Sequence, residues 1–179
     1  MSEKNTLRVW TFFRQGIRIQ GAHEFTPPAL SIVKTDLRTG AQDAPSPVDD
    51  GMEALTCQLK FYGVDVDMLT AFGFVSGSRP RFTAYQGYLA NGTALGTIEE
   101  IEGFVQTVTP DARGKDSLSE NAVTVDIAVS YYRQTKDGRE LFAIDTERFA
   151  RRVNGVDVLS GLCSAAKFSG LFCSQFRTT

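Results

Sequence analysis

Three glutamates in the middle of the chain are the strongest candidates for acid–base chemistry. Glu99, Glu100 and Glu102 have the residue type that glycosidases use as a general acid and a general base. The segment around them has the pattern of a strand, and adjacent residues of a strand point to opposite faces. The three carboxylates therefore do not converge on one substrate, and they are interpreted as charged residues along a strand.

Two further motifs that resemble catalytic sites fail on their composition. Gly87 and Gly92 repeat the glycine spacing of a phosphate-binding P-loop, but Thr93 stands where that motif has its lysine. His23 is the only histidine, and the chain has no Gly-x-Ser-x-Gly elbow, which argues against a serine hydrolase. His23 is interpreted as a surface residue of a strand.

The cysteines and the paired aspartates do not form a recognisable metal site. Cys57, Cys163 and Cys173 include no Cys-x-x-Cys pair and are interpreted as reduced, packed thiols. Asp49 and Asp50 lie in a polar stretch without the alternating oxygen ligands of a calcium loop. The sequence therefore predicts no catalytic residue, no metal and no cofactor.

Composition predicts one folded domain over residues 1–179. The chain is 42% hydrophobic and contains 13 phenylalanines, which is enough apolar material for a core or an interface. A net charge of -2 does not favour coating of nucleic acid. No apolar run approaches the roughly 20 residues that cross a bilayer, so no membrane anchoring is expected.

Alternating apolar and polar residues around glycine turns predict antiparallel hairpins. Residues 55–61 are the clearest strand, and an extended stretch follows Pro27 and Pro28. Three hairpins are expected, made by residues 7–13 with 17–19, by 81–90 with 97–108, and by 123–132 with 140–145.

Two short helices are expected beside these strands. One follows Asp65, and the other covers residues 156–167 with Asp157 as its cap. The predicted fold class is mainly β, an antiparallel β-sandwich or barrel with one or two short helices and long extended loops.

Two polar loops interrupt the predicted strands, at residues 39–51 and 110–121. Loops of about 12 residues are uncommon inside a compact domain and are often functional. The loop at 39–51 is therefore a candidate contact arm. The alternative is a mobile surface loop, which the residues alone favour.

Several short segments occur in an order and spacing that resemble one protein family. They are FFRQG at 12–16, GAQDAP at 40–45, GMEAL at 51–55, FYGVD at 61–65, LTAFG at 69–73, VSYY at 129–132, DGREL at 137–141, ID at 144–145 and VNGVDVL at 153–159. Together they resemble the major tail tube proteins of contractile-tailed phages of the P2 type and of R-type pyocins. The chain differs in a shorter glycine-rich run before Asp43 and in a C-terminal extension at 168–179.

The resemblance implies a structural subunit and no enzyme. Hexameric rings would stack into a hollow tube that conducts DNA or an effector when the surrounding sheath contracts. The implied partners are further copies of the chain, the sheath protein, the baseplate and tail terminator proteins, a tape measure protein in the lumen and DNA in transit. The implied location is a virion tail or tail-like particle, assembled in the cytoplasm of the bacterial host.

The resemblance also assigns roles to individual residues. Gly40, Ala41, Gln42, Asp43, Ala44 and Pro45 would contact a neighbouring subunit, within the exposed inter-subunit loop at 39–51. Asn154, Gly155, Val156 and Asp157 would form the turn into the last helix. Glu99, Glu100 and Glu102 would line the lumen, with a solvated strand as the equal alternative.

Two other functions stay open at this point. The chain would fit the inner tube of a secretion or extracellular injection system, which has a similar architecture without packaged DNA. A monomeric small-molecule-binding β-barrel, in which phenylalanines line a cavity, is the alternative from another class.

Overall fold

The computed structural model describes residues 6–40, 43–62, 79–90, 92–111 and 122–166. The expected helix after Asp65, nearly all of the loop at 110–121 and the C-terminal extension at 168–179 lie outside the described residues. The elements are β1 (Thr6–Arg14), β2 (Ile17–Arg18), β3 (Ala22–Thr26), β4 (Ile32–Leu37), β5 (Ser46–Met52), β6 (Leu55–Tyr62), β7 (Arg81–Ala90), β8 (Thr93–Pro110), β9 (Ala122–Lys136), β10 (Arg139–Asp145), β11 (Ala150–Val153), β12 (Val156–Asp157) and α2 (Ser160–Ala165).

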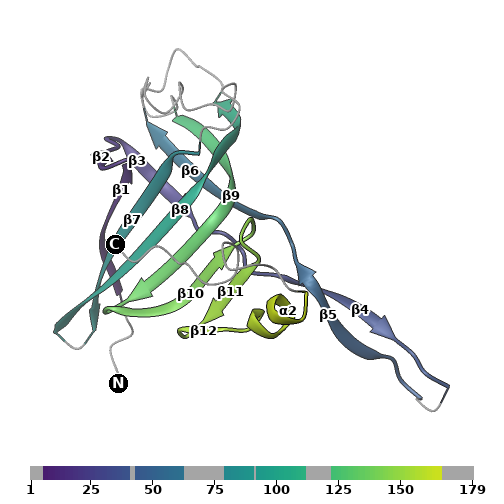
Figure 1. Ribbon diagram of the computed structural model, residues 1–179. Helices are drawn as coiled ribbons and strands as arrows, with labels where there is room; N and C mark the ends of the chain where they lie inside the picture. The colour runs from purple at the N-terminus through teal and green to yellow at the C-terminus, as the bar shows by residue number, and fades with distance from the viewer. Residues whose placement is uncertain (1–5, 41–42, 63–78, 91, 112–121, 167–179) are drawn as a thin grey trace.

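Ten of the strands form one antiparallel sheet, and the other two form a separate hairpin (Figure 1). The main path runs β12-β11-β10-β9-β8-β7-β1-β2, while β6 joins it through β9 and carries β3 on its other edge. The expected mainly β, antiparallel class is confirmed. The described strands curl strongly but do not close into a barrel, because β2 and β3 form no ladder with each other.

β9 is the strand that holds the sheet together. One edge of β9 pairs with β8, and its other edge pairs with β6 from Ala122 to Val129 and then with β10 from Tyr131 to Lys136. Ser130, at the change of partner, is left out of the ladder with β8, as the extra residue of a β-bulge is. The bulge turns β9, so that one long strand serves two different neighbours.

The core fills the inside of this curl. Phe12 on β1 packs against Phe82 on the adjacent strand and against Phe25 on β3, with ring centroids 5.9 and 5.2 Å apart. Since β3 reaches β1 only through β6 and the full width of the sheet, the contact with Phe25 shows how far the sheet bends. Phe61 and Leu59 on β6 are fully buried in the same cluster.

The predicted hairpin turns are confirmed by the backbone. Gln15 and Gly16, and likewise Asp137 and Gly138, have positive φ angles, as the tight turns that suit twisted strands require. β7 and β8 pair up to Ala90 and Thr93, so they also form the hairpin expected from the sequence. No helix in the described part of the chain is long and apolar enough to span a membrane.

Three expectations about local structure are wrong. Residues 46–51 of the predicted loop belong to β5, because Ser46 to Met52 pair with β4. The last helix is shorter than residues 156–167, and Leu159 is its N-cap. Asp157 lies in β12 instead, where its carboxylate accepts a hydrogen bond from the Leu159 N–H. Cys163 is disulfide-bonded, so it is not the reduced thiol expected from the sequence.

Gly103 gives a direct test of the β8–β9 packing. A Cβ at this position would lie 2.1 Å from the backbone oxygen of Ala128, whereas a Cβ at Gly96 on the same strand would meet nothing within 4 Å. We expect Gly103→Ala to destabilise the fold by about 1–3 kcal/mol, as overpacking does, and Gly96→Ala to have little effect. Chemical denaturation of the two variants checks this, and equal stabilities would contradict the described packing.

Candidate assembly surface

The hairpin of β4 and β5 projects from the main sheet into solvent (Figure 1). Its two strands pair with each other and with no other described strand. Every residue of the two strands except Met52 is exposed. A two-stranded hairpin is marginally stable by itself in water, so this one is expected to be stabilised by whatever it contacts.

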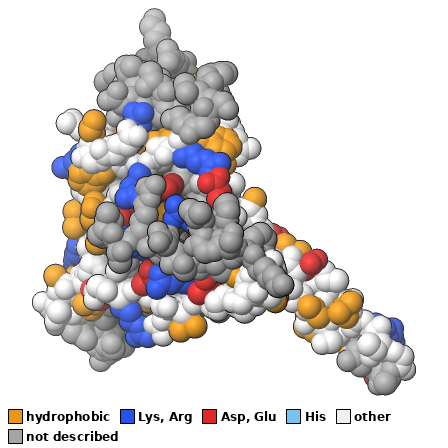
Figure 2. All heavy atoms as spheres, in the orientation of Figure 1, with side chains coloured by type: hydrophobic (Ala, Val, Ile, Leu, Met, Phe, Trp, Pro, Cys, Tyr) orange, Lys and Arg blue, Asp and Glu red, His pale blue; other side chains and the backbone are white. Residues whose placement is uncertain are grey.

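One face of the hairpin has three apolar side chains. Val33, Thr35 and Leu37 share this face of β4, and Val48 pairs with Thr35 on it. Their side chains are 38%, 54% and 42% exposed, respectively. Figure 2 shows hydrophobic side chains on the projecting hairpin. Apolar side chains grouped on a solvent-exposed ribbon are typical of a protein–protein contact.

The described residues of the segment assigned to the inter-subunit contact lie at the far end of this hairpin. Gly40 and residues 43–45 are exposed, and residues 41–42 lie outside the described residues. The Arg38 guanidinium donates to the backbone oxygen of Asp43 at 3.3 Å across the tip. The structure therefore places this segment away from the main sheet.

The acidic cluster is divided between the two faces of the sheet. Glu100 forms an ion pair with Arg133, and Arg81 donates to Glu102 at 2.6 and 2.9 Å. The carboxylate of Glu102 raises the pKa of Arg81. Both glutamates lie on the face opposite the core, where each is matched by an arginine on a neighbouring strand.

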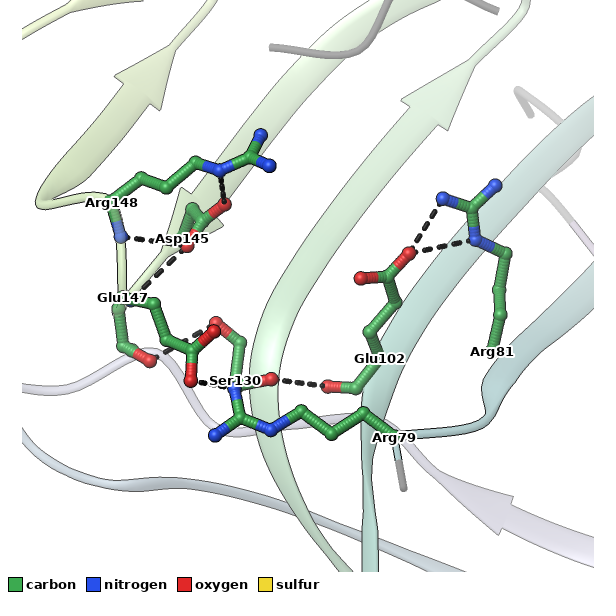
Figure 3. Close-up of polar contacts among 8 residues, drawn as sticks. Arg79, Arg81, Glu102, Ser130, Asp145, Glu147 and Arg148 are labelled. Carbon is green, nitrogen blue, oxygen red and sulfur yellow. Dashed lines mark hydrogen bonds and ion pairs between the residues drawn. The ribbon is translucent and has the colours of Figure 1, made fainter. Parts of the chain in front are cut away.

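This charged face continues to the turn after β10 (Figure 3). Arg79 pairs with Glu147, and Arg148 lies 3.7 Å from the carboxylate of Asp145. Four arginines and four carboxylates line one hollow around the Ser130 bulge: Arg79, Arg81, Arg133, Arg148, Glu100, Glu102, Asp145 and Glu147. Their formal charges cancel, so the hollow presents polar groups without a net charge.

Glu99 points in the opposite direction, into the core, and its side chain is almost fully buried. Oε1 of Glu99 accepts hydrogen bonds from Gln86 and Gln134, at 3.2 and 3.3 Å. Burial raises the pKa of this carboxyl, and the hydrogen bonds partly oppose that shift. The prediction of a solvated or lumen-lining role is therefore wrong for Glu99 in the subunit, because β8 turns this residue inward.

The remaining candidates have structural roles. Asn154 and Gly155 have positive φ angles and form the tight turn between β11 and β12, ahead of the helix rather than directly into it. His23 is exposed on β3 beside Tyr62, as predicted. Burial raises the pKa of Cys57 to about 12, so this thiol stays protonated and unreactive. Within the described residues, no cluster of metal-ligating side chains is present.

Sequence reasoning missed the arginine partners and the ends of the sheet. Arg81 and Arg133 lie 21 and 33 residues from their glutamates, and no local spacing connects them. Leu7 and Val9 on β1 are 46% and 60% exposed at a strand that pairs with β2 only at its C-terminal end. The sequence shows that Leu7 and Val9 alternate with polar residues, but it does not show which side of β1 is exposed to solvent.

The described residues form a mainly β subunit with a projecting hairpin whose strands pair with no other described strand. The family model for phage tail tube protein FII matches residues 4–165, and the chain belongs to this family. The chain is 27% identical over 172 residues to the tail tube protein of Escherichia phage P2, covering 89% of this chain and 95% of that protein.

Two solved structures share the fold. The sheath/tube terminator of an extracellular contractile injection system, PVC, in its extended state matches with a TM-score of 0.56 and 11% identity, over 70% of this chain and 92% of that one. A chain of the PVC sheath-tube complex matches with the same TM-score and 10% identity, over 70% and 87%.

The buried carboxyl of Glu99 predicts a pH-dependent stability. A folded-state pKa above the ordinary 4.5 means that this group favours folding most at low pH, and that its contribution falls as pH rises through the folded pKa. Glu99→Gln keeps an acceptor for Gln86 and Gln134 but does not ionise. We expect its melting temperature, relative to wild type, to rise across this window.

Thermal unfolding between about pH 4 and pH 8 measures the effect. Glu53→Gln is the matched control, because Glu53 is exposed and lies outside the core. A constant difference between Glu99→Gln and wild type over that range would contradict an ionisation effect.

Proposed function

We propose that this tail tube protein forms hexameric rings, which stack into the hollow inner tube of a contractile phage tail or phage-tail-like particle. The observation that carries the proposal is the projecting hairpin with its apolar face of Val33, Leu37 and Val48. Family membership supports the tube. In a ring, one patch of each copy must bind a different patch of the next copy, and a projecting arm is suited to such a head-to-tail contact.

The tip of the hairpin is the proposed inter-subunit contact, made by Gly40, Ala41, Gln42, Asp43, Ala44 and Pro45. Edge strands present unpaired backbone groups and tend to pair with another chain. The exposed outer part of β1, around Leu7 and Val9, is a candidate edge for the wall between subunits. Joining of sheets across subunits would satisfy these groups and close the wall.

We propose that the face of Glu100 and Glu102 lines the lumen. Its carboxylates are matched by Arg133 and Arg81, so the surface offers no excess positive charge to phosphates. A wall that bound DNA tightly would slow its passage, because phosphate contacts supply most of the non-specific affinity. Glu99 is not part of this proposal, since it is buried in the core.

The proposed partners are the sheath, baseplate and tail terminator proteins outside the tube, and a tape measure protein and DNA inside it. The likeness to chains of sheath and tube assemblies supports this placement. The subunit would act by assembly and not by catalysis, within a virion tail put together in the host cytoplasm.

The inner tube of an extracellular injection system is the second candidate, favoured by the fold shared with the PVC chains. Identification of the cargo in purified particles, DNA or protein, separates the two. A small-molecule-binding barrel has less support, because Phe12, Phe25 and Phe82 pack against one another in the core instead of lining a cavity.

Removing the tip tests the contact arm. Deletion of residues 40–47 is expected to abolish tubes while leaving a folded subunit, because the core lies in the main sheet and not in the hairpin. Negative-stain electron microscopy and light scattering measure assembly, and circular dichroism measures folding. Tubes of normal length from the shortened chain would show that the arm is not the contact.

The apolar face of the hairpin gives a finer test. The double substitution Leu37→Asp and Val48→Asp places charges where an apolar contact is proposed, and burying an unpaired charge is strongly unfavourable. We expect loss of tubes at concentrations where wild type assembles. Asp36→Ala, on the other face of the same ribbon, is the control and should assemble normally. Equal assembly of the two variants would exclude the apolar face from the interface.

A further inference from the structure

The base of the hairpin contains a bulge at Asp49, Asp50 and Gly51. Lys34 pairs with Asp49 and Ile32 pairs with Met52, so two residues of β5 oppose one residue of β4. Gly51 has a φ angle of 103°, which an L side chain rarely adopts. A bulge of this kind bends a strand and increases its twist. The direction of the hairpin is therefore set at these residues.

Both aspartates of this bulge hold it with their side chains. Oδ1 of Asp49 accepts a hydrogen bond from the Gly51 N–H at 2.9 Å. Oδ2 of Asp50 accepts one from the Thr35 hydroxyl at 2.7 Å, which ties β5 to β4. The aspartate pair is thus explained by the bend of the hairpin and not by metal binding.

The second carboxylate oxygen of Asp49 accepts a hydrogen bond from an arginine of the main sheet. Nη2 of Arg151, on β11, donates to Oδ2 of Asp49 at 2.6 Å, across 102 residues of sequence. The Arg151 side chain is only 16% exposed in the folded chain, so the ion pair is partly shielded from solvent on the side of the sheet. The same ion pair lowers the pKa of Asp49, so its carboxylate is charged at neutral pH.

An apolar crease lies next to this ion pair. It is lined by Ile32 and Met52 from the hairpin, and by Phe142, Ile144 and Val153 from β10 and β11. Met52 also packs against the core, so the root of the hairpin is anchored while the part beyond the bulge is exposed. The ion pair thus joins the hairpin to the sheet at the point where the anchored part ends.

We propose that Asp49, Asp50, Gly51 and Arg151 form a clasp that aims the hairpin before it binds a second copy of this chain. These are positioning residues, and the inference rests on the proposed function of the hairpin as the inter-subunit arm. An arm already held in its bound direction loses less conformational freedom on binding. Through this effect alone, the clasp increases the affinity between copies.

Four variants test the clasp. Asp49→Asn and Arg151→Gln each break the ion pair, the double exchange Asp49→Arg with Arg151→Asp reverses it, and Asp36→Asn is the control. Asp36 is on the hairpin but pairs with Lys34 and not with the sheet. Spin labels on unnatural amino acids at Ser46 and Lys136 report the direction of the arm in the unassembled subunit, without the native cysteines.

We expect a wider distance distribution in Asp49→Asn and Arg151→Gln. Half-maximal tube formation should need about 3- to 10-fold more protein, because an arm without a fixed direction loses more conformational freedom on binding. The charge exchange should restore both properties in part only, because Asp49→Arg also removes the acceptor for the Gly51 N–H. Recovery beyond either single variant is a result that a merely structural defect would not allow. Tubes, once formed, should have the wild-type diameter.

The proposal is overturned if Asp49→Asn matches Asp36→Asn in either the distance distribution or assembly. Other results would contradict the proposed function instead of the clasp. If the deletion of residues 40–47 still assembles, or wild type forms no rings, then the arm is not the contact, and the assembly role of the clasp falls with it. The distance measurement on single subunits separates that result from a failure of the clasp itself.

Discussion

The fold depends on the double pairing of β9. One strand of 15 residues supplies hydrogen bonds to β8 along one edge and to β6 and then β10 along the other. Buried backbone N–H and C=O groups are costly when unpaired, so the ladder that changes partner must do so at a defined residue. The bulge at Ser130 is that residue, and its carbonyl accepts from the N–H of Thr146 where β10 ends.

This arrangement brings the remaining strands into place. Because β6 and β10 follow each other on the same edge, the sheet bends around the core on one side and carries β11 and β12 on the other. The close approach of Gly103 to Ala128 lies beside the same bulge. The inner face becomes a phenylalanine-rich core, and the outer face becomes the band of paired charges around Ser130.

Local sequence patterns predict many of the strands and turns, but they do not predict the long-range contacts. The alternation of residues 55–61 and the glycine turns at Gly16 and Gly138 define β6 and two hairpins, because strand periodicity and positive φ angles are local properties. The residues of β5 predict a loop, since Pro47, Asp49, Asp50 and Gly51 have low strand propensity. Pairing with β4 and the bulge overcome that preference.

For the charged residues, too, local sequence predicts the alternation of faces but not the long-range partners. Strand periodicity predicts that adjacent glutamates lie on opposite faces. Which face is buried depends on the curl of the whole sheet, so the sequence does not predict the inward position of Glu99. Arg151 carries no local signal that connects it with Asp49, which lies 102 residues away. Such pairs are determined by topology, and a single sequence contains no direct record of them.

The subunit consists of a large sheet and a projecting β4–β5 hairpin with a defined direction, and this arrangement affects how a tube would assemble. A subunit that is stable before assembly must keep its interface residues out of its own core, and the proposed interface residues Val33, Leu37 and Val48 satisfy this because they lie on a hairpin outside the core. Exposed apolar residues in a small group cost little in solution but favour burial against a neighbour. Since ring contacts repeat around a closed assembly, each can be modest, provided that every arm leaves the sheet in the same direction. In the proposed tube, a defined bend at the root of the arm therefore acts together with the apolar side chains along the arm.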